Sequence, residues 1–380
     1  MDHAATTPLR PEVLETMLPY FSEEFGNASS VYGWGRRARQ ALDRSRDTVA
    51  EILGAQAEEI VFTGSGSEAI NLALKGAAKA QQKKGRHIVT TAIEHHAAYD
   101  SVFWLKKNGY EVTVLPVDSE GRINPEAVRS ALRPDTILVS VMHANNEVGT
   151  IQPISAIGAL VQEHGALFHT DAVQTAGILK LNVDELNVDL LSLAAHKFYG
   201  PKGVGALYVR KGVRLEPLVH GGFQERGRRA GTENIAGIVG LASALDLAAA
   251  ERELESRRLA RLRDRLFAGL QEIPFTRING SRVHRLPNNV SVCFEFIEGE
   301  SLLLNLDLRG VAASSGSACT SGSLEPSHVL LALGLSHEIA HGSLRLTLGR
   351  ETTESDVDYV LGEIPEIVHR LREMSPLYQA

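Results

Sequence analysis

Residues 60–69 read Ile-Val-Phe-Thr-Gly-Ser-Gly-Ser-Glu-Ala, which predicts a strand, a turn of small residues and the start of a helix. The apolar run ends at Thr63, and a helical pattern then continues over residues 67–83. Such a turn leaves backbone N–H groups free at the positive end of a helix, so it is a candidate phosphate cradle. A simple tight turn between a strand and a helix is the alternative interpretation.

A second class of protein shares this pattern. Gly64, Gly66 and Ala69 fit the spacing of a dinucleotide-binding turn, and Glu94 lies at the end of the next predicted strand. A nicotinamide-dependent dehydrogenase therefore stays an alternative at this point.

Strands and helices alternate downstream of this unit. We expect strands at residues 87–91, 111–115, 136–141, 167–170, 190–193 and 205–209, and helices at 97–108, 125–132 and 154–164. This alternation predicts an α/β fold with a mostly parallel central sheet covered by helices on both faces.

The pattern changes after Asn234. A long helical tract runs to about Glu272, and its charged part at 251–265 is typical of a solvated helix face. Strands at 289–294 and 344–348 and helices near Ser301 and Glu354 follow, which predicts a smaller α+β domain. We expect a large domain at residues 8–250, and a small domain formed by residues 1–7 with 251–380.

Composition and charge narrow the function classes. The chain has 380 residues, with 39 Lys and Arg against 46 Asp and Glu, a balance that gives no support to a nucleic-acid or anionic-membrane partner. The chain has only two cysteines, so we do not expect a disulfide framework. We therefore expect a cytoplasmic location. The first residues lack a signal-peptide pattern, and the apolar stretch 235–250 is too short and too polar to span a bilayer.

Polar residues follow the predicted strands, where open parallel sheets bind ligands. Glu94 and His95 follow one strand and Asp171 ends another, while His196 and Lys197 follow a third. Taken singly, each residue also has a purely structural interpretation. His95 is then a hydrogen-bonded histidine, Asp171 a capping carboxylate and Lys197 a surface lysine. No metal site is expected, because no further His or Cys cluster has zinc-ligand spacing.

Taken together, these groups match the needs of one cofactor. A desolvated lysine such as Lys197 can form a Schiff base, a carboxylate such as Asp171 favours a cationic ring nitrogen, and an imidazole such as His95 can stack on the ring. With a phosphate cradle, this set is what pyridoxal phosphate requires. A nicotinamide-dependent dehydrogenase would account for the phosphate cradle but not for Lys197, Asp171 or His95.

At this point the chain closely resembles the NifS/IscS-type cysteine desulfurases, homodimeric pyridoxal-phosphate enzymes with the aspartate-aminotransferase fold (fold type I). The motifs that carry the resemblance run through nearly the whole chain: Asp-His-Ala-Ala-Thr-Thr-Pro (2–8), Gly-Asn (26–27), Ala-Asn-Asn-Glu-Val-Gly (144–149), Asp-Ala-Val-Gln (171–174), the lysine motif, Arg-Arg-Ala-Gly-Thr-Glu-Asn (228–234), Gly-Ser-Ala-Cys (316–319) and Arg-Leu-Thr-Leu-Gly-Arg (345–350).

The resemblance implies a role for each catalytic and ring-binding residue. Lys197 would form the Schiff base and move protons at the substrate Cα. Asp171 would hold the ring nitrogen and Gln174 the ring hydroxyl. His95 would stack on the ring and shuttle a proton.

The resemblance also implies the phosphate and substrate contacts. Gly66, Ser67 and His196 would bind the cofactor phosphate, and Thr232 would reach the phosphate of the neighbouring subunit's cofactor. Asn146 would contact the cofactor and, with Arg345, hold the substrate carboxylate. One departure bears on cofactor affinity: Ala194 stands where the family usually has a phosphate-binding serine.

The two cysteines have different surroundings. Cys293 lies in an apolar strand and is expected to be an inert core residue, whereas Cys319 lies among Ser and Gly in residues 314–323. Such a segment behaves as a flexible coil, so we expect a mobile loop that brings the Cys319 thiol to the substrate sulfur. The alternative is a surface loop with an incidental cysteine.

The predicted activity is therefore conversion of L-cysteine to L-alanine, with the sulfur held on Cys319 as a persulfide. It would supply iron–sulfur cluster assembly and other thio-cofactors through an acceptor such as a scaffold protein, with a transient cluster at Cys319 as a further hypothesis. The alternatives are another enzyme of the same fold, such as a selenocysteine lyase or a small aminotransferase, and a non-catalytic sulfur carrier.

Overall fold

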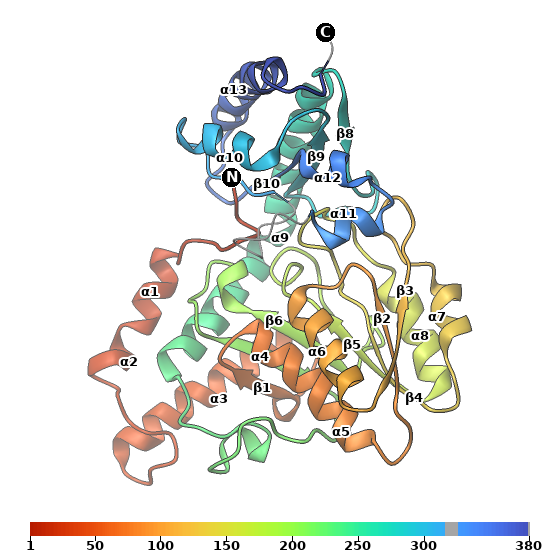
Figure 1. The fold of residues 1–380 in the computed structure, drawn as a ribbon. Coiled ribbons are helices and arrows are strands. Elements are labelled where there is room, and N and C mark those ends of the chain that lie inside the picture. Colours follow the sequence, from red (N-terminus) through yellow and green to blue (C-terminus); the bar gives the residue numbers. More distant parts are fainter. Residues whose placement is uncertain (316–325, 379–380) are drawn as a thin grey trace.

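The computed structural model of the chain describes residues 1–315 and 326–378 (Figure 1). Its larger sheet has the strand order β1-β7-β6-β5-β4-β2-β3. The strands are β1 (Ile60–Thr63), β2 (His87–Thr91), β3 (Glu111–Leu115), β4 (Thr136–Ser140), β5 (Leu167–Asp171), β6 (Leu190–Ala194) and β7 (Gly205–Val209). Only the two pairs that β7 makes are antiparallel, so the predicted mostly parallel sheet is confirmed.

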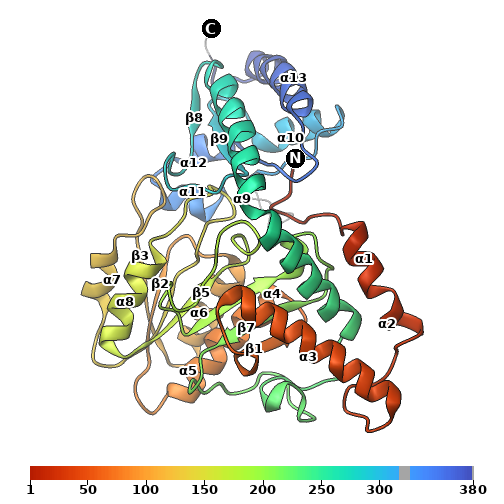
Figure 2. The same cartoon turned by 180° about the vertical axis from the view of Figure 1, so that it is seen from behind.

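Helices cover both faces of this sheet (Figures 1 and 2). Ile60 and Phe62 of β1 belong to one apolar core and Val61 to the other, as expected from the alternation of side chains along a strand. The first core includes residues of α1 (Pro11–Met17), α3 (Gly33–Leu53), α7 (Pro125–Ala131), α8 (Ile154–His164) and the first part of α9 (Ile235–Gln271). The second includes residues of α4 (Gly66–Asn71), the π-helical turn Leu72–Gly76, α5 (Ala77–Gln81) and α6 (His96–Lys107).

A smaller antiparallel sheet has the order β10-β9-β8. Its strands are β8 (Thr276–Ile278), β9 (Asn289–Phe294) and β10 (Ser343–Thr347), and its core includes residues of α9, α10 (Gly299–Asp307) and α13 (Glu354–Glu373). The predicted strands at 289–294 and 344–348 are confirmed to within one residue. The remaining described helices are α2 (Pro19–Ser22), α11 (His328–Ala332) and α12 (His337–His341).

The helix α9 contributes to the first core of the large sheet and to the core of the small sheet. Leu241 and Leu245 pack in the core of the large sheet, and Leu259, Leu262 and Leu266 pack in that of the small sheet. The predicted domain boundary at residue 250 falls between these two groups and stays a prediction. None of the described helices combines the length and the apolar character that a membrane crossing requires.

The first residues of the chain connect the two sheets. Asp2 forms a β-bridge with Thr347 of β10, and the Ala4 N–H donates to Thr347 Oγ1 at 2.8 Å. A few residues later, Thr7 Oγ1 donates to the His196 carbonyl at 3.0 Å, just after β6. This segment therefore passes from the small sheet to the strand ends of the large one.

Candidate active site

A cavity of about 470 Å³ lies at the carboxyl ends of the large sheet's strands. Nine residues predicted from the sequence line it: Gly66, Ser67, His95, Asn146, Asp171, Gln174, His196, Lys197 and Arg345. Thr232 is exposed and does not line this cavity of its own chain. Cys319 lies outside the described residues, and so does most of the predicted loop 314–323.

The turn after β1 is shaped by small residues. Ser65 begins α4, and its side-chain oxygen accepts the Glu68 N–H at 3.0 Å. A Cβ on Gly66 would lie 3.0 Å from both Ala194 Cβ and Val173 Cγ2, a tight fit that favours glycine there. The turn therefore has little room for a side chain at Gly66, beside the cavity that Gly66 and Ser67 line.

Lys197 lies in a short 3₁₀ turn, Ala195–Lys197, that directly follows β6. Its Nζ donates to the carbonyl oxygens of Ala4 at 2.5 Å and Ala5 at 2.8 Å. The N-terminal segment thus holds the lysine amine at the edge of the cavity.

Asp171 ends β5 and is buried. Burial raises the pKa of this carboxyl to about 6, and the Val173 N–H, 2.9 Å from Oδ1, together with the nearby Lys197 charge, opposes the rise. A buried carboxylate of this kind gains stability when a cation comes within reach. The ring nitrogen of a protonated pyridine would be such a cation.

Two histidines of the site are held in the neutral form. Burial, followed by the Lys197 charge, lowers the pKa of His95 to about 4, and its Nδ1 accepts the Ala97 N–H at 3.1 Å. Burial and the same lysine lower the pKa of His196 to about 4, and its Nδ1 lies 3.2 Å from Thr6 Oγ1. A neutral imidazole with Nδ1 as acceptor carries its proton on Nε2, so His95 can donate there.

Arg345 on β10 reaches the cavity from the small sheet. Its Nη1 donates to the Asn146 carbonyl at 3.2 Å, and its Nη2 lies 2.8 Å from Asp2 Oδ1. The Asn145 side chain fixes the turn that carries Asn146, because its Oδ1 accepts the N–H groups of Glu147 and Val148 at 2.8 and 2.9 Å. These contacts hold the Arg345 guanidinium against the backbone of Asn146, and a guanidinium is suited to a carboxylate ligand.

Sequence reasoning missed several residues of the site. Asp2, Ala4, Ala5 and Ser314 also line the cavity, and none was assigned a role. They come from opposite ends of the chain, so no local spacing connects them with the strand ends. Asp2, Ala4 and Ala5 belong to a motif noted for its resemblance, and Ser314 opens the predicted loop 314–323.

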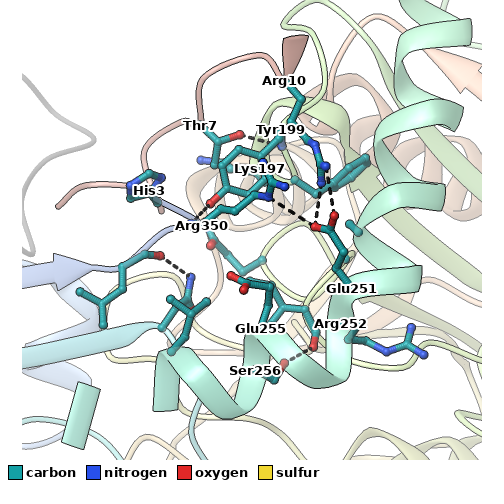
Figure 3. A pocket seen from close by; sticks show the side chains of 18 residues that line it. His3, Thr7, Arg10, Lys197, Tyr199, Glu251, Arg252, Glu255, Ser256 and Arg350 are labelled. Atoms are coloured by element: carbon teal, nitrogen blue, oxygen red, sulfur yellow. Dashed lines mark hydrogen bonds and ion pairs between the residues drawn. The ribbon is translucent and has the colours of Figure 1, made fainter. Parts of the chain in front are cut away.

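A second, smaller cavity shares Gln174 and Lys197 with the first (Figure 3). Arg10 donates to Glu251 of α9 at 2.8 and 3.1 Å, and the Tyr199 hydroxyl accepts the Arg350 N–H at 2.7 Å. Tyr199 has a φ of 66°, a conformation that L-residues seldom adopt. These contacts connect Arg10 to α9, and the loop after Lys197 to Arg350, which follows β10.

Cys293 matches the expectation of an inert core residue. It is buried on β9, its Sγ accepts from Asn279 Nδ2 at 3.2 Å, and burial raises its pKa to about 11. A thiol with this pKa is almost wholly protonated at neutral pH.

Comparison with known proteins gives consistent matches. Residues 1–360 match the family model of class-V aminotransferases. The chain is 58% identical over 377 residues to a cysteine desulfurase IscS of Methanosarcina thermophila, covering 99% of this chain and 93% of the relative.

Solved structures agree. A NifS-like protein superimposes with a TM-score of 0.92 and 40% identity, covering 97% of this chain and 99% of the other. SspA, solved in complex with cysteine, gives a TM-score of 0.81 and 38% identity, with 91% of this chain and 97% of that chain covered. The aspartate-aminotransferase-like fold is thereby confirmed.

Class-V aminotransferases use pyridoxal phosphate, and the residues of the large cavity fit it. Asp171 is a buried carboxylate that a cation stabilises, Gly66 has little room for a Cβ, and the Lys197 amine reaches the same space. The dehydrogenase alternative has no support from these matches. With the fold, the cavity and a match over residues 1–360 in agreement, the chain belongs to the class-V aminotransferase family.

Proposed function

We propose that this chain is a pyridoxal-phosphate-dependent cysteine desulfurase that converts L-cysteine to L-alanine and holds the sulfur on Cys319 as a persulfide. The observation that carries the proposal is the convergence of Lys197, Asp171, His95 and Arg345 on one cavity. The 58% identity to a relative named cysteine desulfurase supports this activity over other reactions of the fold.

The proposed cofactor contacts are those that the resemblance to cysteine desulfurases implies, and their support is that these residues line one cavity. Gly66, Ser67 and His196 would hold the phosphate, while Asp171 would pair with the ring nitrogen and Gln174 with the ring hydroxyl. The neutral His95 ring would stack on the cofactor. The bound cofactor supplies an electron sink for charge that develops at the substrate Cα.

The protein's own groups would move the protons and position the substrate. Arg345 and Asn146 hold the α-carboxylate, and the Lys197 amine takes the Cα proton and later returns a proton to the carbon chain. The Cys319 thiolate attacks the substrate sulfur, the bond between sulfur and Cβ breaks, and a persulfide forms. Cysteine and the Cys319 thiol thus become alanine and a persulfide, with no outside oxidant.

Mass spectrometry tests the sulfur acceptor directly. After addition of L-cysteine, the peptide containing Cys319 should gain the mass of one sulfur atom, and the peptide containing Cys293 should not, because that thiol is buried. Cys319→Ser should retain bound cofactor and form no persulfide, and Lys197→Ala should lose at least about a thousandfold in alanine formation. Full-rate sulfur release by Cys319→Ser would remove Cys319 from the mechanism.

The same assay separates the alternatives. A selenocysteine lyase or an aminotransferase of this fold would leave Cys319 unmodified by cysteine, and an aminotransferase would need a keto acid as co-substrate. A non-catalytic sulfur carrier would take up sulfur without bound cofactor.

We further propose a homodimer. Apolar side chains are exposed over α2 and the segment that leads to α3, including Phe21 and Phe25, each 63% exposed, and Val31 at 87%. Phe223 is 84% exposed, and Thr232 is exposed as well. Exposed apolar groups of this size favour contact with another protein surface, and a second copy would bring Thr232 to the partner's cofactor.

A mixing experiment tests this role of Thr232. Lys197→Ala and Thr232→Ala subunits should each be impaired as homodimers, whereas a mixed dimer contains one site with an intact lysine and an intact threonine. Activity should therefore rise on mixing, towards half that of the wild type. No rise in verified mixed dimers would mean that Thr232 serves its own subunit or has no role at the site.

The wider role is part of the same proposal. We place the protein in the cytoplasm, supported by the presence of only two cysteines, and expect it to supply an iron–sulfur scaffold protein and other thio-cofactor pathways. A transient cluster at Cys319 would belong to this transfer.

A further inference from the structure

Arg345, which the proposed function assigns to the substrate carboxylate, is already bound to a carboxylate of its own chain. Its Nη2 lies 2.8 Å from Asp2 Oδ1, and Nη1 donates to the Asn146 carbonyl at 3.2 Å. The Nε is buried and has no hydrogen-bond partner among the residues that the structure describes. Asp2 therefore uses only one of the guanidinium N–H groups that could form a paired contact.

The second oxygen of Asp2 is bound elsewhere. Ser314 Oγ donates to Asp2 Oδ2 at 2.8 Å, and the Ser314 backbone forms a β-bridge with Arg345. Asp2 is thus held between the arginine and the serine by one oxygen each, rather than by a two-point contact with the guanidinium. A carboxylate that used Nε and Nη2 together would make one more charge-assisted hydrogen bond to Arg345 than Asp2 does.

The difference in hydrogen bonding to Arg345 is important because the Arg345 side chain is buried. Arg345 is 4% exposed, so its charge needs a partner when no ligand is present, whereas the Asp2 side chain is 20% exposed and can turn towards solvent. Both residues line the same cavity as Lys197. Asp2 can therefore neutralise the buried arginine in the free enzyme and still leave when a better ligand arrives.

We propose that Asp2 is a competing ligand of the substrate-carboxylate site, bound to Arg345 in the free enzyme and displaced by the α-carboxylate of the amino acid. This inference rests on the proposed function of Arg345. The occupied state lowers apparent substrate affinity, because only the fraction of molecules with a free guanidinium binds. Asp2 therefore sets the substrate concentration at which the enzyme responds and keeps weak carboxylates off the arginine.

The test compares ligand binding in variants of the cofactor-loaded enzyme. L-Alanine serves as the probe, because it has the substrate's carboxylate and amine but no sulfur, and calorimetry measures its Kd. Asp2→Asn keeps an oxygen for the Ser314 hydroxyl but removes the charge from Arg345, so it should tighten alanine binding by about three- to tenfold. The KM for cysteine should fall by a similar factor, with a much smaller change in kcat.

Two further variants separate this inference from the function on which it rests. Arg345→Ala should lose alanine binding in the wild-type and Asp2→Asn backgrounds alike, and if it binds alanine normally, the assignment of Arg345 to substrate fails. Asp135→Asn removes the same charge from an exposed pair with Arg133, 2.8 Å apart, and should change neither constant.

The inference is overturned if Asp2→Asn, with a melting temperature and cofactor content equal to those of the wild type, binds alanine with unchanged or lower affinity. Unchanged affinity would make Asp2 a purely structural partner of Arg345. Weaker binding would mean that Asp2 attracts the substrate amine rather than competing with its carboxylate.

Discussion

Three buried carboxylates lie close to the predicted coenzyme site. Burial raises the pKa of Glu94 to about 8, of Glu147 to about 7 and of Asp171 to about 6. Glu147 accepts a hydrogen bond from Ser327 and lies near the Arg345 charge, and Asp171 lies near Lys197. Glu94 has no cation among its influences, so it is mostly protonated at neutral pH.

The raised pKa of Glu94 predicts how the free energy of unfolding changes with pH. Its Oε1 accepts from Thr91 Oγ1 at 2.6 Å and from the Met142 N–H at 3.0 Å, contacts that a glutamine oxygen can keep. Because the folded pKa is raised from 4.5 to about 8, the stabilisation is complete below pH 4.5 and is lost as the pH rises towards 8.

In Glu94→Gln, that loss should be absent. Urea unfolding should show the variant gaining on the wild type by roughly 1–3 kcal/mol between pH 5 and pH 8. A constant difference across this range would mean that Glu94 is ionised in the folded protein throughout.

Part of the site was predictable from strand signals, whereas Asn146, Gln174 and Arg345 were named only from the family resemblance. Lys197, Asp171 and His95 end or follow apolar runs, and parallel strands bring such ends to one edge. Asp2 and Ser314 were not predictable, since their meeting depends on how β10 returns beside the first residues of the chain.

Among the elements, β7 requires a glycine at position 205. It is antiparallel to both neighbours, β1 and β6, and Gly205 pairs with Thr63 on one side and Ala194 on the other. A Cβ on Gly205 would lie 2.6 Å from the Ser65 carbonyl carbon and 2.8 Å from the Leu193 oxygen. Glycine there lets the turn after β1 pass close to the sheet.

Gly205→Ala should therefore displace the turn that carries Gly66 and Ser67. We expect a loss of roughly 1–3 kcal/mol in unfolding free energy and a cofactor affinity lowered by about tenfold or more. Spectroscopic titration with pyridoxal phosphate measures the affinity, and denaturant unfolding measures the stability.

Gly362→Ala is the matched control, because that glycine is in α13 with nothing within 4 Å of the new Cβ. It should stabilise the protein by roughly 0.5–1 kcal/mol and leave cofactor affinity unchanged. If Gly205→Ala bound pyridoxal phosphate with wild-type affinity, the packing at Gly205 would not determine the position of the turn that carries Gly66 and Ser67.

The periodicity of the sequence predicted most elements to within a residue or two, including β2, β3, β9 and α8. It did not predict α1, α2 or α3, and it did not reveal β8, whose three residues are too short a pattern to stand out. The direction of β7 was also not predicted, because direction within a sheet depends on connections and packing rather than on local preference.

At the scale of the whole molecule, the large and small sheets are joined by α9 and by the segment of residues 2–10. Arg10, which is 6% exposed, lies at this junction and bonds to Glu251 of α9 and to Glu12. Arg350, which follows β10, lies 3.4 Å from the same Glu251 carboxylate. The charges at the junction therefore connect the chain's beginning, middle and end.

Arg10→Gln should weaken that junction. Removing a mostly buried partner of Glu251 should lower the unfolding free energy by roughly 1–3 kcal/mol, measured in urea. Arg39→Gln removes an exposed pair with Asp43 and should cost no more than about 0.5 kcal/mol. Equal losses in the two variants would show that the Arg10 contacts add no more than a surface ion pair.

The N-terminal segment also has a consequence for synthesis on the ribosome. Residues 2–5 touch Lys197, Arg345 and Thr347, so one wall of the pocket combines residues that are translated well before β10 with residues of β10 itself. A nascent chain that stops before β10 lacks the strand on which Asp2 docks, and premature termination products should be inert rather than partly active.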